Sequence, residues 1–165
     1  VINKKSNIKD INYSEELIII LDGIQDPGNF GTILRTIDSA NLKQVIVTNK
    51  TVDAYNSKVI RSTMGATFRV NVIESDDIIK TIKEIKKHKF KVAATSLQTD
   101  KSVYDVDFSK IAIVIGNEAN GVSEEVMNMA DIKMKIPMLG KTESLNASVA
   151  TGILIYEYVR KKLTK

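Results

Sequence analysis

The 165-residue sequence contains no cysteine, no tryptophan, two prolines and one histidine, His88. Without cysteine the chain can form no disulfide, thiolate nucleophile or thiolate metal site, and such a composition fits a reducing compartment. A single histidine leaves almost nothing for a histidine zinc site or a Ser/His/Asp triad. We therefore expect no bound metal. With four phenylalanines and five tyrosines, an aromatic platform for stacking bases is not evident either.

Long apolar runs are also missing. No run approaches the length of about 18 residues that spans a membrane, and no secretory signal is visible, so we expect a cytoplasmic protein without membrane contact. A 43% hydrophobic content is enough for one compact domain with a real core. The net charge of +4 is compatible with a polyanionic partner. The lysine-rich stretches near residues 80–89 and 160–165 are explained better as a solvated helix face and a chain end than as a binding stripe.

Strand-like and helix-like stretches alternate along the chain. Short continuous apolar runs predict buried strands, and apolar residues at helical spacing predict helices. We expect strands at 17–21, 44–48, 68–73, 90–95, 111–115 and 132–136. We expect helices at 32–40, 56–64, 76–88, from Ser123 onward, and at 147–163. Such an order predicts an α/β fold with a mostly parallel sheet and helices on both faces.

Residues 1–14 are polar and rich in lysine and asparagine, so we predict a linker or irregular arm there and a single domain over 15–165. The sequence begins with Val1 rather than methionine. We therefore expect either a complete minimal protein or part of a longer one with a preceding domain, and the Val1 start favours the second.

Three polar, glycine-bearing loops each follow a predicted strand. Because ligands of open α/β sheets bind at the carboxyl ends of strands, we expect the loops to form one composite site. The first loop is Asp26-Pro27-Gly28-Asn29-Phe30-Gly31, in which Asn29 can cap the following helix. Arg35 lies one to two turns into that helix, where its fork suits a phosphate. The alternative is a plain turn with Arg35 paired to Asp38.

The second loop is Gly116-Asn117-Glu118-Ala119-Asn120-Gly121. Glu118 can accept hydrogen bonds from a ligand or orient Arg35, or it is an ordinary exposed carboxylate. The third loop runs from Pro137 to Asn146, where Ser144 and Asn146 can cap the last helix. A dinucleotide-binding Rossmann enzyme is disfavoured because no glycine-rich phosphate loop follows the first strand.

Together and in this order, the three motifs resemble those of the SpoU (TrmH-like) RNA ribose 2′-O-methyltransferases of the SPOUT superfamily. The segments that carry the resemblance are 26–36, 115–122, 136–138 and 143–150. The resemblance implies a deep trefoil knot in the C-terminal part, S-adenosylmethionine as methyl donor, and a homodimer acting on RNA. It casts a set of five residues as catalytic and RNA-orienting: Asn29, Arg35, Glu118, Ser144 and Asn146.

By the same resemblance, the methyl donor would be bound in the knot, largely by backbone. The residues expected around it are Thr95, Ser96, Gly116, Asn117, Gly121, Ile136, Met138, Leu145 and Asn146. Many relatives carry a separate N-terminal RNA-binding domain, to which nothing here corresponds. The resemblance casts Arg35 as the group that activates the 2′-hydroxyl, but a guanidinium stays protonated at neutral pH and is a poor base. We therefore expect Arg35 to hold the neighbouring phosphate and stabilise the developing alkoxide.

Ribosomal RNA is the favoured substrate. The alternatives are transfer RNA, a catalytically silent knotted RNA-binding module, and methylation of a guanine base as in other SPOUT branches. The Ser144-Leu145-Asn146 motif favours ribose, and the intact Asn29, Arg35 and Glu118 favour catalysis over a silent module.

Overall fold

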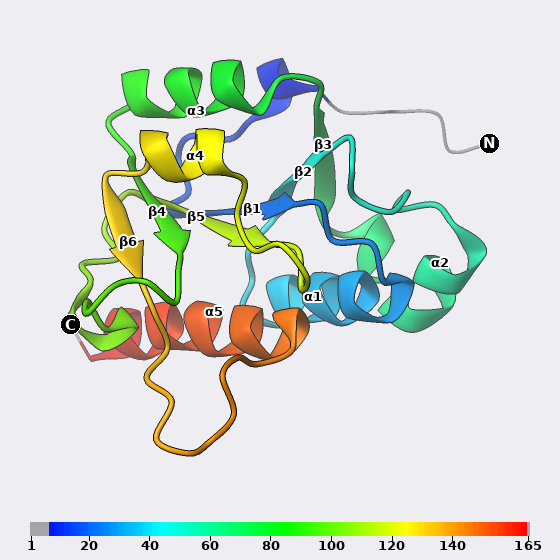
Figure 1. The fold of residues 1–165 in the computed structure, drawn as a ribbon. Helices are drawn as coiled ribbons and strands as arrows, with labels where there is room; N and C mark the ends of the chain where they lie inside the picture. The colour runs from blue at the N-terminus through cyan, green and yellow to red at the C-terminus, as the bar shows by residue number, and fades with distance from the viewer. Residues whose placement is uncertain (1–6, 165) are drawn as a thin grey trace.

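A six-stranded parallel sheet forms the centre of the molecule, in a computed structural model that describes residues 7–164 (Figure 1). The strand order is β3-β2-β1-β5-β4-β6, and every strand pairing is parallel. The strands are β1 (Leu17–Asp22), β2 (Gln44–Thr48), β3 (Asn71–Ser75), β4 (Lys91–Thr95), β5 (Ile111–Gly116) and β6 (Ile132–Met134). The α/β class with a parallel sheet is therefore confirmed.

Helices cover both faces of the sheet, as predicted. The helices are α1 (Pro27–Ser39), α2 (Ser57–Thr63), α3 (Ile78–Lys87), α4 (Glu124–Met129) and α5 (Ala147–Leu163). One apolar core joins α1 and α5 to alternate sheet residues such as Ile19 and Ile113, and a second core joins α3 and α4 to the residues between them. In Figure 1, α1, α2 and α5 lie on one side of the sheet and α3 and α4 on the other.

Two predicted elements begin three or more residues away from their predicted start, each for a local reason. The first long helix begins at Pro27 rather than Thr32, because Asp26 caps it and the fixed φ of proline suits a first helical position. The third strand begins at Asn71 rather than Phe68. Met64 and Gly65 both have positive φ, and a 3-10 turn (η2, Ala66–Phe68) follows them, so the chain straightens only after that turn.

The described part of the predicted arm, residues 7–14, packs against the domain. A 3-10 turn (η1, Ile8–Asp10) leads to Ile11, which is 6% exposed and joins the second core. The ring of Tyr13 stacks on that of His88 with centroids 3.5 Å apart. The first six residues of the predicted arm lie outside the described residues.

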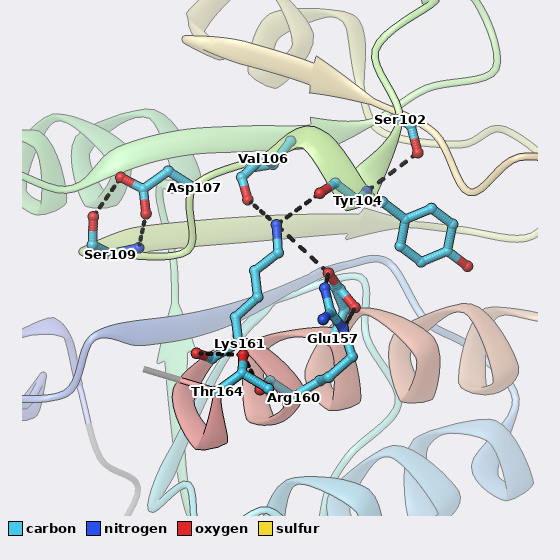
Figure 2. A network of polar contacts seen from close by, with 9 residues as sticks. All are labelled: Ser102, Tyr104, Val106, Asp107, Ser109, Glu157, Arg160, Lys161 and Thr164. Atoms are coloured by element: carbon cyan, nitrogen blue, oxygen red, sulfur yellow. Dashed lines mark hydrogen bonds and ion pairs between the residues drawn. The ribbon is translucent and has the colours of Figure 1, made fainter.

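The end of α5 is fastened to the crossover between β4 and β5. Figure 2 shows the Lys161 ammonium donating hydrogen bonds to the main-chain carbonyls of Tyr104 (2.8 Å) and Val106 (2.7 Å), beside the carboxylate of Glu157. Glu157 is buried and also accepts two hydrogen bonds from Arg160. These contacts fix the last helix, whose first residues belong to the site described next.

Candidate active site

The site lies where the order of strands reverses. Strands β1 and β5 are neighbours at the centre of the sheet, and their last residues, Asp22 and Gly116, are paired. Across the sheet, β2 and then β3 lie on one side of β1. On the other side lie β5, β4 and β6, in that order. A crevice at such a reversal, at the carboxyl ends of the strands, is the usual ligand site of an open α/β sheet.

The start of α1 places Asn29 at this edge of the sheet, in contact with the loop after β5. The Asp26 carboxylate accepts a hydrogen bond from the Asn29 backbone nitrogen at 2.7 Å, so Asp26 is the helix cap. The prediction that Asn29 caps the helix was wrong. An aspartate directly before a proline and a run of helical spacing was the signal for the true cap. Because Asp26 has this role, the Asn29 side chain is available for other contacts.

Asn29 joins the three predicted loops. Its amide nitrogen donates to Glu118 Oε1 at 2.5 Å, and its amide oxygen accepts from Asn146 Nδ2 at 2.9 Å. These contacts connect residues 89 and 117 positions apart in the sequence. The structure thus brings together Asn29, Glu118 and Asn146, as the resemblance implied. Glu118 contacts Asn29 rather than orienting Arg35.

Asn146 is also the cap of α5. Its side-chain oxygen accepts hydrogen bonds from the backbone nitrogens of Ser148 (2.9 Å) and Val149 (3.3 Å) and from the Ser148 hydroxyl (2.6 Å). Capping by Asn146 is therefore confirmed, whereas Ser144 is exposed and has no hydrogen bond within residues 7–164. Ser148 was not predicted as part of this cluster.

The loop after β5 is tightly built. A Cβ at Gly116 would lie 2.0 Å from the backbone carbon of Gly121, so only glycine fits there. The Asn117 amide donates to the carbonyl of Gly23 at 2.8 Å, and its oxygen accepts from the Ala119 nitrogen at 2.8 Å. The Asn117 side chain therefore braces the loop against the end of β1. This bracing, which the sequence did not reveal, holds Glu118 opposite Asn29.

Arg35 lies outside this cluster. It is exposed on α1, and its side chain has no hydrogen bond or ion pair within residues 7–164. It does not pair with Asp38, whose carboxylate accepts hydrogen bonds from Arg69 at 2.7 and 2.9 Å. Those hydrogen bonds hold the pKa of Asp38 below its usual value. Arg35 instead lines a groove of about 400 Å³ whose wall includes Arg69 and Met64 but none of Asn29, Glu118 and Asn146.

The residues predicted around the methyl donor lie at the same carboxyl edge. Thr95 ends β4, and its hydroxyl donates to the Val114 carbonyl at 3.3 Å. The Ser96 nitrogen donates to the Met134 carbonyl at 2.9 Å, which joins β4 to β6. Ile136, Met138 and Leu145 are half-buried on the segment between β6 and α5. Residues 7–164 contain no cluster of three acidic or histidine side chains able to hold a metal ion.

Comparison with known proteins assigns the family. The model of the SpoU rRNA methylase family matches residues 16–156, most of the chain. The chain belongs to this family. Among SpoU relatives, 23S rRNA (guanosine(2553)-2′-O)-methyltransferase RlmP of Bacillus subtilis is 36% identical over 140 residues, which are 84% of this chain and 56% of that protein.

Solved SpoU structures share the fold. The AdoMet-bound rRNA methyltransferase from Sinorhizobium meliloti superposes with a TM-score of 0.86 at 31% identity, covering 96% of this chain and 61% of that one. The A. aeolicus TrmH/SpoU tRNA modifying enzyme gives 0.82 at 32% identity, over 90% of this chain and 76% of that one. The chain thus spans little more than half the length of RlmP. No helix among residues 7–164 is long and apolar enough to cross a membrane.

Proposed function

We propose that the protein transfers a methyl group from S-adenosylmethionine to a ribose 2′-hydroxyl of structured RNA, with ribosomal RNA as the substrate. The observation that carries this proposal is the hydrogen-bonded chain Glu118–Asn29–Asn146, built from all three loops at the reversal of strand order. The activity for which RlmP is named and the AdoMet bound to the Sinorhizobium enzyme support it. The proposed place of action is the cytoplasm.

The segment between β6 and α5 suits this donor. Within the described residues, no backbone group of residues 136–145 has a hydrogen bond to the rest of the chain. Free backbone groups beside the half-buried Ile136, Met138 and Leu145 fit an adenine, which needs apolar contact on its faces and hydrogen bonds at its edge. Thr95, Ser96, Gly116, Asn117 and Gly121 would complete the binding surface from the ends of β4 and β5. When bound, S-adenosylmethionine supplies an electrophilic methyl group on a sulfonium.

The residues of the chain have to align the hydroxyl and accept its proton. Asn29 and Asn146 fix the Glu118 carboxylate, whose second oxygen has no hydrogen bond within residues 7–164 and is available to accept that proton. Arg35 would grip the phosphate next to the reacting ribose through two parallel hydrogen bonds. Ser144, exposed beside Asn146, would contact the same nucleotide. Alignment of this kind can account for much of the barrier reduction in a displacement reaction.

Three further features belong to the proposal. The segment after β6 runs along the loop that joins β4 to β5, and the Lys135 backbone is hydrogen-bonded to the backbone of Lys101 and Val103. Helix α5 then returns beneath the sheet. This path is compatible with a trefoil knot. Val149, Tyr156 and Leu163 are exposed at seven-residue spacing on α5, which suits a homodimer. Residues 15–165 would be the catalytic domain, and an N-terminal RNA-binding domain would precede it in the whole protein.

A transcript of Bacillus subtilis 23S rRNA spanning guanosine 2553, the position named for RlmP, is a suitable substrate for the first test. Titration calorimetry should show one S-adenosylmethionine bound per chain, and nucleoside mass spectrometry should show a 2′-O-methylated nucleotide. Asn146→Ala should lose methyl transfer. A folded chain that binds RNA but no S-adenosylmethionine would instead support the silent RNA-binding module. Methylation of a tRNA transcript alone would move the substrate to transfer RNA, as for the A. aeolicus enzyme.

A further inference from the structure

The excess positive charge of the chain is concentrated in one segment. Residues 27–70 contain six basic residues and two acidic ones, so their net charge of +4 equals that of the whole chain. The basic residues are Arg35, Lys43, Lys50, Lys58, Arg61 and Arg69, and the acidic ones are Asp38 and Asp53. The remaining 121 residues are balanced, with eighteen of each sign. This segment contains α1, which carries Asn29, and α2 beside it.

On α2 the charge forms a row. Lys58 and Arg61 are three residues apart on α2, which places them on one face of the helix, and Met64 directly follows the end of the helix. All three are exposed, and Met64, at the end of the row, is 74% exposed and lines the groove that contains Arg35. The side chains of Lys58 and Arg61 have no hydrogen bond or ion pair to any residue of 7–164. The row thus continues the groove along α2.

The one acidic residue that lines the groove, Asp38, would not repel a bound anion, because its charge is paired. Asp38 is held in a two-pronged contact by Arg69, whose Nε and Nη2 both donate to its carboxylate. Arg35 lines the groove and has no acidic partner among residues 7–164, so its positive charge is not neutralised. The hydroxyl-bearing Thr32 and Thr36 line the groove beside it. The groove and the α2 row together are polar, positive and open, which suits a phosphodiester chain better than an apolar partner.

Packing fixes this surface relative to the candidate active site. The Ser62 hydroxyl on α2 shares its proton between the carbonyls of Val59 (2.8 Å) and Pro27 (3.2 Å), and its side chain occupies the space where a Cβ of Gly31 would be. Helix α2 is therefore held against the first two turns of α1, from which Asn29 projects. A strand of RNA bound along α2 would meet α1 near its start.

We propose that the groove of Arg35 and the row Lys58–Arg61–Met64 form a binding track for the RNA backbone that flanks the target nucleotide. Arg35 contacts the phosphate nearest the reacting ribose, and Lys58 and Arg61 contact phosphates farther along the strand. The track rests on the proposed function, because it supplies RNA to that same site. It also gives the catalytic domain an RNA contact that does not depend on any N-terminal domain.

The lysine-rich helix α3 provides the comparison surface. It lies on the opposite face of the sheet, and three of its lysines have carboxylate partners: Lys80 with Asp77, Lys86 with Asp131 and Lys87 with Glu84. Lys80 and Lys83 have the same three-residue spacing as Lys58 and Arg61. The double variant Lys80→Ala/Lys83→Ala therefore removes the same charge from a helix outside the track.

The experiment compares Lys58→Ala/Arg61→Ala with this α3 variant and with the wild-type chain. Binding of the 23S rRNA transcript is measured over a range of salt concentrations. Two lost phosphate contacts should reduce the slope of log affinity against log salt by about 1.4 to 1.8 for the α2 variant and leave it unchanged for the α3 variant. S-adenosylmethionine affinity should be the same in all three chains.

Two outcomes would overturn the track: equal RNA binding by the α2 and α3 variants, or no RNA binding by the wild-type chain. A shift of the α2 variant from dimer to monomer, with RNA binding intact, would also overturn it and assign the row to a contact between copies. None of these depends on methyl transfer. If the wild-type chain binds RNA along the track but neither binds S-adenosylmethionine nor methylates RNA, the proposed function fails and the track stands.

Discussion

At the scale of single residues, the candidate site is a directional chain of hydrogen bonds. An ionised Glu118 can only accept, so the amide nitrogen of Asn29 must face it. The amide oxygen of Asn29 then accepts from the Asn146 nitrogen, which leaves the Asn146 oxygen to cap α5. The two asparagine orientations are thus fixed by the carboxylate at one end and the helix amides at the other.

Asn29→Asp tests this chain. The new carboxylate would still accept from Asn146 but would face Glu118 without a proton to share. Losing a charge-assisted hydrogen bond costs about 1.5–3 kcal/mol, so we expect kcat/KM to fall by roughly 10- to 100-fold at neutral pH. Because neighbouring carboxylates raise each other's pKa, activity should partly recover at lower pH. Methyl transfer is measured from pH 5 to 8, with Asn128→Asp on the exposed face of α4 as the control. An unchanged rate would exclude Asn29 from the site.

At the scale of elements, the contact between α1 and α2 is unusually close. A Cβ on Gly31 would lie 1.8 Å from the Ser62 hydroxyl oxygen and 2.6 Å from its Cβ. The Ser62 hydroxyl already donates to the Val59 carbonyl at 2.8 Å, so it cannot turn away without cost. This glycine is needed for the approach of two helices rather than for a turn.

Gly31→Ala should therefore destabilise the protein by about 1–3 kcal/mol, the usual range for overpacking. Ser62→Gly makes room for the new methyl group but costs about 1 kcal/mol by itself, because glycine weakens a helix. In the double variant the two losses should be less than additive, since the clash is absent. Urea unfolding of the four chains measures this. Additive losses would mean that the helices do not touch at these residues.

The end of α5 should respond to acid. The hydrogen bonds from Arg160 hold the pKa of the buried Glu157 below its usual value of 4.5. A depressed pKa stabilises the fold above the unfolded-state value and loses that contribution as the pH falls through the folded-state value. We expect Glu157→Gln to lose less stability than wild type between pH 7 and pH 3. Urea unfolding at the two pH values measures it, with the exposed Glu125→Gln as control. Equal losses would contradict a role for the network in Figure 2.

The sequence was sufficient for the elements that depend on local pattern. The continuous run Leu17–Leu21 and the spacing of α5 predicted a buried strand and the last helix with the observed bounds of α5. It failed where a single backbone conformation decides. Met64 adopts a left-handed conformation that a methionine rarely takes, so no pattern could place the turn that delays β3.

At the scale of the whole molecule, α5 presents an apolar stripe to solvent. Val149 and Tyr156 are about half exposed, and Leu163 is 81% exposed. If the stripe is the proposed dimer contact, Val149→Lys/Leu163→Lys should give monomers with the helical content retained, because two buried charges per copy would have no partner. Sedimentation equilibrium and circular dichroism measure this. Phe68→Lys, at an exposed apolar residue away from α5, is the control. A dimeric double variant would place the interface elsewhere.

The composite nature of the site could be predicted, since parallel strands end at one edge and each loop follows a strand. The partners within it could not. The contact of Asn29 with Glu118 was not predicted, because Asn29 was expected to cap α1, a role that Asp26 has instead. Arg35 is separated from Glu118 because of the way α1 packs. The contact of Gly31 with Ser62 decides which face of α1 meets α2.

The long separations within the Asn29 cluster have a consequence for folding. Contacts between residues 89 and 117 positions apart close large loops of chain, so they form late compared with local helices and turns. During synthesis, Asn29 and the whole of β1 emerge long before Asn146 exists. A chain that has not yet finished its last helix can hold much of the sheet and still have no active site. Appearance of methyl transfer during refolding would therefore report completion of the native topology, later than the recovery of secondary structure.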